Sequence, residues 1–177
     1  MEGIVSLLDS EHYRLTERLW AELESTFGLR GIYITPFPHF SYHVAQDYEA
    51  AKLEPMLKQL TQSLKAFRVQ ASGLGVFTGP SPVLYIPVVR TSELSQLHEA
   101  LWQATEGSLD IPDYYRPENW LPHITLAFGD IYPDTLPEVM RLLGERPLNW
   151  EITVDNLAFI EKTAQGQQVR FRFSFEG

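Results

Sequence analysis

Two short segments of this sequence share one pattern: a proline, a histidine, any residue, a hydroxyl-bearing residue and a hydrophobic residue. They are Pro38-His39-Phe40-Ser41-Tyr42 and Pro122-His123-Ile124-Thr125-Leu126. Residues i and i+2 of a β-strand point to the same face of the sheet, so we expect His39 beside Ser41 and His123 beside Thr125. If the two strands lie side by side, two imidazoles and two hydroxyls meet in one groove.

Such a groove suits the hydrolysis of a phosphodiester. A neutral imidazole can take a proton from the attacking water while a protonated one gives a proton to the leaving oxygen, because both forms coexist near a pKa of about 6.5. The hydroxyls can donate hydrogen bonds to the phosphate oxygens. We therefore predict His39 and His123 as the catalytic pair and Ser41 and Thr125 as phosphate-binding residues, with no metal required. Ordinary β-propensity is the alternative explanation of the two hydroxyls.

Each motif follows a strand and a helix, which indicates a hidden duplication. Residues 3–8 and 83–89 are expected as strands, and a helix follows each of them. Asp9 or Ser10 can cap the first helix, whose apolar stripe ends before Gly28, and Thr91 or Ser92 can cap the other. The motif strands are expected within residues 32–45 and 121–128. The apolar stripe of the first helix consists of Leu15, Leu19, Leu23 and Phe27.

The remaining elements complete an α+β fold. A helix is expected over residues 48–64 with Pro55 in its first turn, and strands over residues 67–77, 151–160 and 169–175. Thr135 and Glu138 predict a capping box for a fourth helix. Two β-α-β units in one domain, residues 1–177, favour a pseudo-twofold arrangement with a groove between the lobes.

Composition and charge exclude several classes of protein. The 177 residues are 44% apolar and 12% aromatic, which is enough for a core, and no cysteine is present for disulfides, thiolate zinc sites or nucleophiles. The net charge of −9 disfavours binding to long nucleic acids. No apolar run reaches the roughly 18 residues that span a bilayer, and the first ten residues do not resemble a signal peptide. We expect a cytoplasmic protein without a membrane partner.

The loop before the second motif supplies further candidates for substrate contacts. An aromatic ring of Tyr114, Tyr115 or Trp120 could stack on a base, and Arg116 could meet a phosphate. Packing of a proline-rich loop explains the same residues equally well.

The other histidines are not assigned to catalysis. Strict alternation puts His43 on the face of His39, at the rim of the groove, and a zinc site of His39, His43 and Asp47 has little support from spacing. His12 and His98 are expected on helices, at the surface or in helix packing.

The two motifs resemble those of the 2H phosphoesterase superfamily, which includes 2′-5′ RNA ligase-like proteins and cyclic phosphodiesterases. The spacing of the histidines, the segment Gly73-Leu74-Gly75-Val76-Phe77 and the run Trp120-Leu121-Pro122 are similar as well. The resemblance covers nearly the whole chain. It implies a bilobal α+β fold with antiparallel sheets lining a central cleft and helices outside, and it places the family's roles on His39, His123, Ser41 and Thr125. The first motif differs from the family pattern in having Ser41 where threonine is more common.

Together these observations predict metal-independent hydrolysis of a 2′,3′-cyclic phosphate or a related cyclic phosphodiester, on a nucleotide or an RNA terminus. No cofactor is expected. Ligation of RNA ends through a 2′-5′ bond on the same site is one alternative. A non-catalytic nucleotide-binding module is the other.

Overall fold

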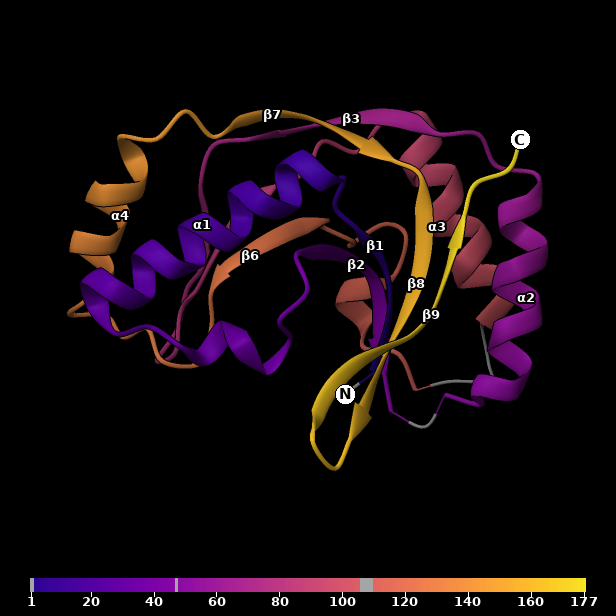
Figure 1. The fold of residues 1–177 in the computed structure, drawn as a ribbon, viewed down its shortest axis with the longest axis horizontal. Coiled ribbons are helices and arrows are strands. Elements are labelled where there is room, and N and C mark those ends of the chain that lie inside the picture. Colours follow the sequence, from indigo (N-terminus) through magenta and orange to yellow (C-terminus); the bar gives the residue numbers. More distant parts are fainter. Residues whose placement is uncertain (1, 47, 106–109) are drawn as a thin grey trace.

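The computed structural model describes residues 2–46, 48–105 and 110–177, and Figure 1 shows their fold. The strands are β1 (Glu2–Leu7), β2 (His39–Ala45), β3 (Phe67–Ser72), β4 (Gly75–Phe77), β5 (Val83–Pro87), β6 (His123–Ala127), β7 (Asn149–Val154), β8 (Asn156–Thr163) and β9 (Gly166–Ser174). The helices are α1 (Ser10–Phe27), α2 (Ala50–Gln62), α3 (Ser92–Thr105) and α4 (Leu136–Gly144), with short 3-10 turns at Gly31–Ile34 and Asp113–Tyr115.

Seven strands form one antiparallel sheet in the order β4-β5-β6-β2-β1-β8-β9, and β3 pairs with β7 in a second sheet. The units β1-α1-β2 and β5-α3-β6 each join two neighbouring antiparallel strands through a helix, which confirms the predicted α+β class and its two repeated units. Among the described residues, no helix is both long enough and apolar enough to cross a membrane.

The two motif strands are neighbours at the centre of the large sheet, but they barely pair. Among the described residues, β2 and β6 form one pair in the sheet, Phe40 opposite Ile124. The sheet therefore consists of two halves, β4-β5-β6 and β2-β1-β8-β9, that meet at this pair. Both side chains are fully buried, so the junction is also part of the core.

A bulge interrupts each motif strand at the fourth residue of its motif, counted from the histidine. Consecutive residues of β1 pair with Ser41 and His43, so Tyr42 has no partner in that ladder. Leu126 is bulged in the same way where β6 pairs with β5. A β-bulge ends strict alternation because two residues oppose one. At each bulge, the strand thus buries two consecutive side chains, Tyr42 and His43 in β2 and Leu126 and Ala127 in β6.

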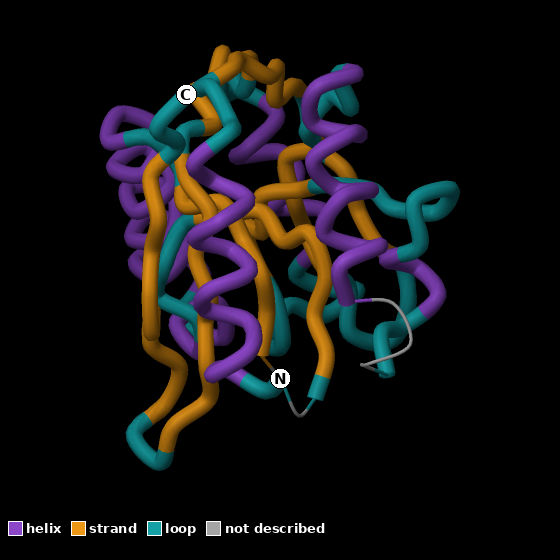
Figure 2. Tube along the Cα trace, turned by 90° about the vertical axis from the view of Figure 1, so that its right-hand side faces the viewer, coloured by secondary structure: helices purple, strands orange, loops and turns teal. Residues whose placement is uncertain are grey.

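Helices cover the sheet and cross between its halves. Asp9 caps α1 by accepting the amide of His12 at 3.1 Å, and Gly28 ends it with a φ of 73°, as predicted. Thr91 accepts the amide of Leu94 at 3.2 Å at the start of α3. α1 packs on β6 and α3 on β2, whereas α2 lies over β8 and β9, in front of them in Figure 2.

Two segments that were each predicted as one strand form two strands in the structure. The strand expected over residues 67–77 is β3 and β4, which belong to different sheets because the chain turns at Gly73 with a φ of 78°. The strand expected over residues 151–160 is likewise β7 and β8, separated at Asp155. Apolar periodicity continues through both turns, so it does not mark the change of sheet.

Two predictions about helix N-termini were also wrong, one on where the helix begins and one on how it is capped. α2 begins at Ala50, so Pro55 lies inside it and not in its first turn. Proline has no N–H to donate to the Ala51 carbonyl, but both residues are exposed and water can bind that carbonyl. At α4, Thr135 makes no capping hydrogen bond through its side chain, because its backbone is already helical.

Candidate functional site

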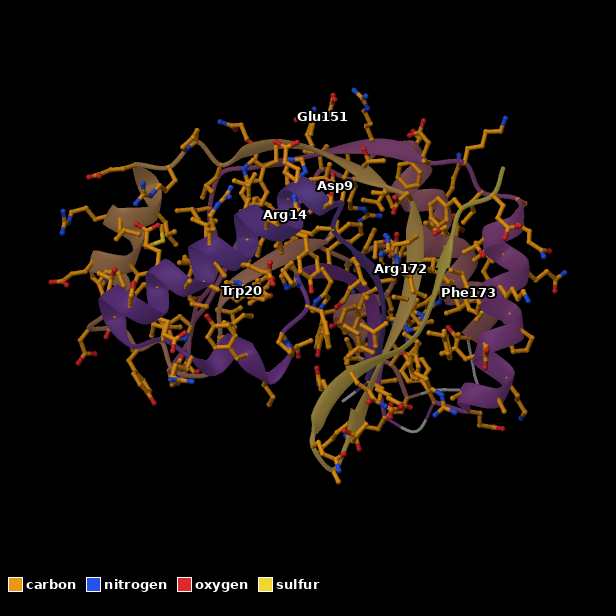
Figure 3. The ribbon with its side chains drawn as sticks, viewed as in Figure 1. Asp9, Arg14, Trp20, Glu151, Arg172 and Phe173 are labelled. Atoms are coloured by element: carbon orange, nitrogen blue, oxygen red, sulfur yellow. The ribbon has the colours of Figure 1, made fainter. Side chains whose placement is uncertain are left out.

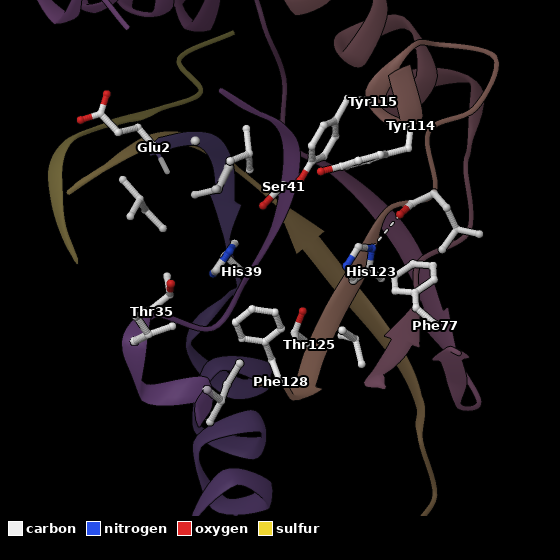
Figure 4. Close-up of a pocket in the computed structure, with 18 of the residues that line it drawn as sticks. Glu2, Thr35, His39, Ser41, Phe77, Tyr114, Tyr115, His123, Thr125 and Phe128 are labelled. Carbon is white, nitrogen blue, oxygen red and sulfur yellow. Dashed lines mark hydrogen bonds between the residues drawn. The ribbon is translucent and has the colours of Figure 1, made fainter. Parts of the chain in front are cut away.

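A cavity of about 780 Å³ opens where the two halves of the sheet meet. His39 and Ser41 from β2 and His123 and Thr125 from β6 all line it, so the structure brings the four predicted residues together (Figure 4). Each of the four is half-buried, while the residue between each pair is fully buried, as strand alternation requires.

The antiparallel crossing decides how the four side chains are arranged. Because Phe40 lies opposite Ile124, the continued register sets His39 against Thr125 and Ser41 against His123. Figure 4 shows the result: the imidazoles lie on opposite sides of the cavity, with the two hydroxyls between them above and below. A group bound at the centre would therefore meet an imidazole on either side.

Backbone carbonyls fix the tautomer of both histidines. Nδ1 of His123 lies 2.8 Å from the carbonyl oxygen of Leu121, and Nδ1 of His39 contacts the carbonyl oxygen of Phe37. A carbonyl can only accept, so Nδ1 carries the hydrogen in each ring. Nε2 is then the atom that can take up or give a proton in the cavity.

The surroundings lower the pKa of both histidines below the usual 6.5. Burial is the main cause for each ring, because it disfavours the charged imidazolium. The pKa of His39 is lowered further by repulsion from His123, and the hydrogen bond from Nδ1 partly offsets the effect in both rings. Both imidazoles are therefore mainly neutral at pH 7, the form in which Nε2 accepts a proton.

An apolar rim surrounds the histidines. Five of the seven exposed large apolar side chains in the described part of the chain line this cavity. Clusters of exposed apolar groups mark binding surfaces on soluble proteins. Glu2 also lines the cavity, and no lysine or arginine of the described residues does. The five rim residues are Ile34, Phe77, Tyr114, Leu121 and Phe128.

Two aromatic rings hold His123 in place, and sequence reasoning did not assign them to the site. The rings of Phe77 and Tyr85 each lie 5.0 Å from the imidazole of His123, measured between centroids. Tyr85 reaches this position because it passes over Gly75, where a Cβ would lie 2.3 Å from the ring. In the sequence, the glycines of the segment Gly73-Leu74-Gly75-Val76-Phe77 could have indicated this close packing.

Replacing Gly75 with alanine should destabilise the protein by about 1–3 kcal/mol, because the added Cβ would overlap the buried ring of Tyr85. Urea unfolding measures this loss. Gly144→Ala is the matched control, since nothing lies within 4 Å of its added Cβ at the end of α4. Equal stability of the Gly75 variant and the wild type would contradict the close packing.

The three predicted substrate contacts in the loop before β6 have different positions. Tyr115 is half-buried and lines the cavity. Trp120 also lines it but is only 2% exposed, so its ring is not available for stacking on a base. Arg116 is absent from the cavity lining; its Nε donates to Asp113 at 2.7 Å, and its guanidinium lies over the ring of Trp102.

The expectation that His43 shares the face of His39 was wrong. The bulge at Tyr42 turns His43 to the opposite face, where it is fully buried with Nδ1 2.7 Å from the hydroxyl of Tyr48. Val44 lines the cavity instead. The alternative zinc site of His39, His43 and Asp47 is not formed as proposed, because His43 lies on the opposite face of the strand from His39. The third residue, Asp47, lies outside the described residues.

The two helical histidines are packing residues. His98 is fully buried against the ring of Trp120, with centroids 3.9 Å apart, and His12 is buried beside Asp9. No group of three or more His, Cys, Asp or Glu side chains in the described ranges has the geometry of a metal site.

The fold and the paired motifs define a class of protein. The chain belongs to the 2′-5′ RNA ligase superfamily, whose sequence profile matches residues 11–166. This membership confirms the resemblance to 2H phosphoesterases and supports an enzyme that acts on phosphodiester bonds.

Solved structures show the same fold at low sequence identity. TT0787 of Thermus thermophilus aligns with a TM-score of 0.71 and 19% identity, over 99% of this chain and 98% of that one. E. coli LigT complexed with 3′-AMP aligns with a TM-score of 0.60 and 18% identity, over 99% and 98%. LigT complexed with ATP gives 0.58 and 12%, over 99% and 97%. No curated protein matches the sequence.

Proposed function

We propose that this protein hydrolyses a 2′,3′-cyclic phosphate on a nucleotide or an RNA terminus, with His39 and His123 as general acid and base. One observation carries the proposal. Two imidazoles, each with Nδ1 bound to a backbone carbonyl and Nε2 left for proton transfer, face each other across one cavity that also contains two hydroxyls. E. coli LigT, which has the same fold, binds 3′-AMP and ATP, and this agrees with a nucleotide substrate.

The geometry suits in-line displacement at phosphorus. Nε2 of one histidine takes a proton from water as the water oxygen attacks the phosphorus atom. The bond to one ribose oxygen breaks on the opposite side, and Nε2 of the other histidine, protonated beforehand, gives that oxygen its proton. Ser41 and Thr125 donate to the non-bridging oxygens, whose charge grows in the transition state. The product is a phosphomonoester, and none of these steps calls for a metal ion.

The rim supports a nucleoside as the rest of the substrate. Phe77, Tyr114 and Phe128 offer exposed aromatic surface, and stacking on an aromatic ring is worth about 1–3 kcal/mol per base. Tyr115 lies beside Tyr114, on the Ser41 side of the cavity in Figure 4, so we propose it as a contact to the sugar or base.

The test is incubation with each 2′,3′-cyclic nucleotide in the presence of EDTA, followed by ³¹P NMR. We expect a phosphomonoester and a maximum of kcat/KM below pH 6.5. The active form carries one proton on the pair, and both pKa values lie below 6.5, so the proton is lost as pH rises. Binding without turnover would instead indicate a non-catalytic module. Joining of RNA halves that carry a cyclic phosphate would indicate a ligase.

A further inference from the structure

Two buried indole N–H groups bind the backbones of the two motifs. Nε1 of Trp20 donates to the carbonyl oxygen of Thr125 at 3.0 Å, and Nε1 of Trp120 donates to the carbonyl oxygen of Ser41, also at 3.0 Å. In each case the acceptor is the residue that supplies the motif's hydroxyl. Figure 3 shows Trp20 on α1, and Trp120 lies in the loop before β6.

Both carbonyls lie next to a bulge, where the two motif strands barely pair. Each carbonyl belongs to the residue just before a bulged one, Tyr42 in β2 or Leu126 in β6. A bulge disrupts the ladder locally, and the two strands share only the Phe40–Ile124 bridge in the described structure. A buried carbonyl left without a donor is costly. At each motif, an indole N–H supplies a donor to this carbonyl.

The two bonds cross between the halves of the molecule. Trp20 belongs to the first β-α-β unit and holds the second motif, whereas Trp120 belongs to the second unit and holds the first. Trp120 is itself fixed: its ring stacks on His98, and a guanidinium N–H of Arg90 donates to its carbonyl at 3.1 Å. The position of each motif therefore depends on the opposite unit.

We propose that Trp20 and Trp120 are positioning residues that set the separation of His39 and His123 by holding the carbonyls of Thr125 and Ser41. The inference rests on the proposed function, because the separation matters for proton transfer to and from one bound phosphate. A displacement of about 1 Å can cost about 10²-fold in rate. Neither indole needs to touch the substrate, since each acts through the strand that carries a histidine.

The test compares Trp20→Phe and Trp120→Phe with Trp150→Phe. Phenylalanine keeps an aromatic ring but has no N–H. Trp150 is buried like the other two, but it lies on β7 and does not line the cavity. We expect kcat to fall about 10- to 100-fold in the first two variants, with little change in KM because the apolar rim is intact. The Trp150 variant should lose stability and keep its kcat.

NMR gives a readout that does not depend on turnover. In ¹⁵N-labelled protein, Trp120→Phe should shift the ring signals of His39 more than those of His123, and Trp20→Phe should do the reverse. If a phenylalanine variant does not fold, benzothienylalanine at that position keeps the size of the indole and lacks only its donor.

The outcomes separate the two proposals. Unchanged kcat and unchanged histidine signals in both variants would overturn the positioning role. A wild-type protein that hydrolyses no cyclic phosphate would overturn the proposed function instead, and the histidine signals would still decide whether the indoles set the geometry.

Discussion

Replacing either His39 or His123 with alanine should lower kcat for cyclic phosphate hydrolysis by about 10²- to 10⁴-fold, because each change removes one of the two proton transfers. Initial rates at saturating substrate measure the loss. The fold should persist, since both rings are half-buried at the surface of the cavity and not in the core. Circular dichroism and the unfolding midpoint check this.

The double variant sharpens the test. Residues that act as a unit show losses that are far from additive, so the His39→Ala, His123→Ala double variant should be little worse than either single variant. His12→Asn serves as the control, because His12 is bonded to Asp9 on α1 and does not line the cavity. Full activity in either single alanine variant would overturn the two-histidine mechanism.

As the pH falls, the free energy of unfolding of this protein should decrease more steeply than protonation of its carboxylates alone would predict. Burial lowers the pKa of His43 to about 3 and that of His98 to about 4, and repulsion adds to each, from His98 on His43 and from Arg90 on His98. The folded state therefore binds fewer protons than the unfolded state below pH 6.5. The contribution of these two histidines to the free energy of unfolding is fully present above that pH. It falls by about 1.4 kcal/mol per pH unit for each histidine as the pH drops toward 4. Urea unfolding between pH 7 and pH 4 measures the slope.

The slope has its own control. His43→Gln removes one titrating ring but keeps a side chain that can form hydrogen bonds with Tyr48 or Thr105, which both contact the His43 ring. This variant should start less stable, and its loss of stability between pH 6.5 and pH 4 should be less steep by about 1.4 kcal/mol per pH unit. An unchanged slope would show that His43 does not stay neutral in the folded protein. Because typical domains are stable by only about 5–15 kcal/mol, the predicted slope removes a large part of the stability by pH 4.

Strand alternation predicted the four residues at the centre of the site but not their neighbours. His39 with Ser41 and His123 with Thr125 follow from a period of two within one short strand. The same rule failed at His43 because the bulge at Tyr42 adds a residue to β2. Nothing in the local sequence marks a bulge of this kind, since its partner strand lies far away in the chain.

The rest of the site comes from contacts between distant elements. Phe77, Tyr85 and His123 meet because β4, β5 and β6 are adjacent in the sheet, and sequence reasoning gave no order of strands. Trp120 looked like a stacking platform because aromatic residues before a motif can serve as one. The structure buries it instead, as a donor to Ser41.

The approximate twofold relation between the motifs has a consequence for regiochemistry. A rotation about the Phe40–Ile124 pair exchanges the two histidines and also the two bulges. On the proposed mechanism, a cyclic phosphate could enter in either of two orientations, with acid and base exchanged, and the catalytic groups alone would not favour opening at the 2′ or the 3′ oxygen. The choice of isomer then falls to the asymmetric surroundings, where Phe77 flanks one imidazole and Thr35 and Glu2 lie toward the other (Figure 4).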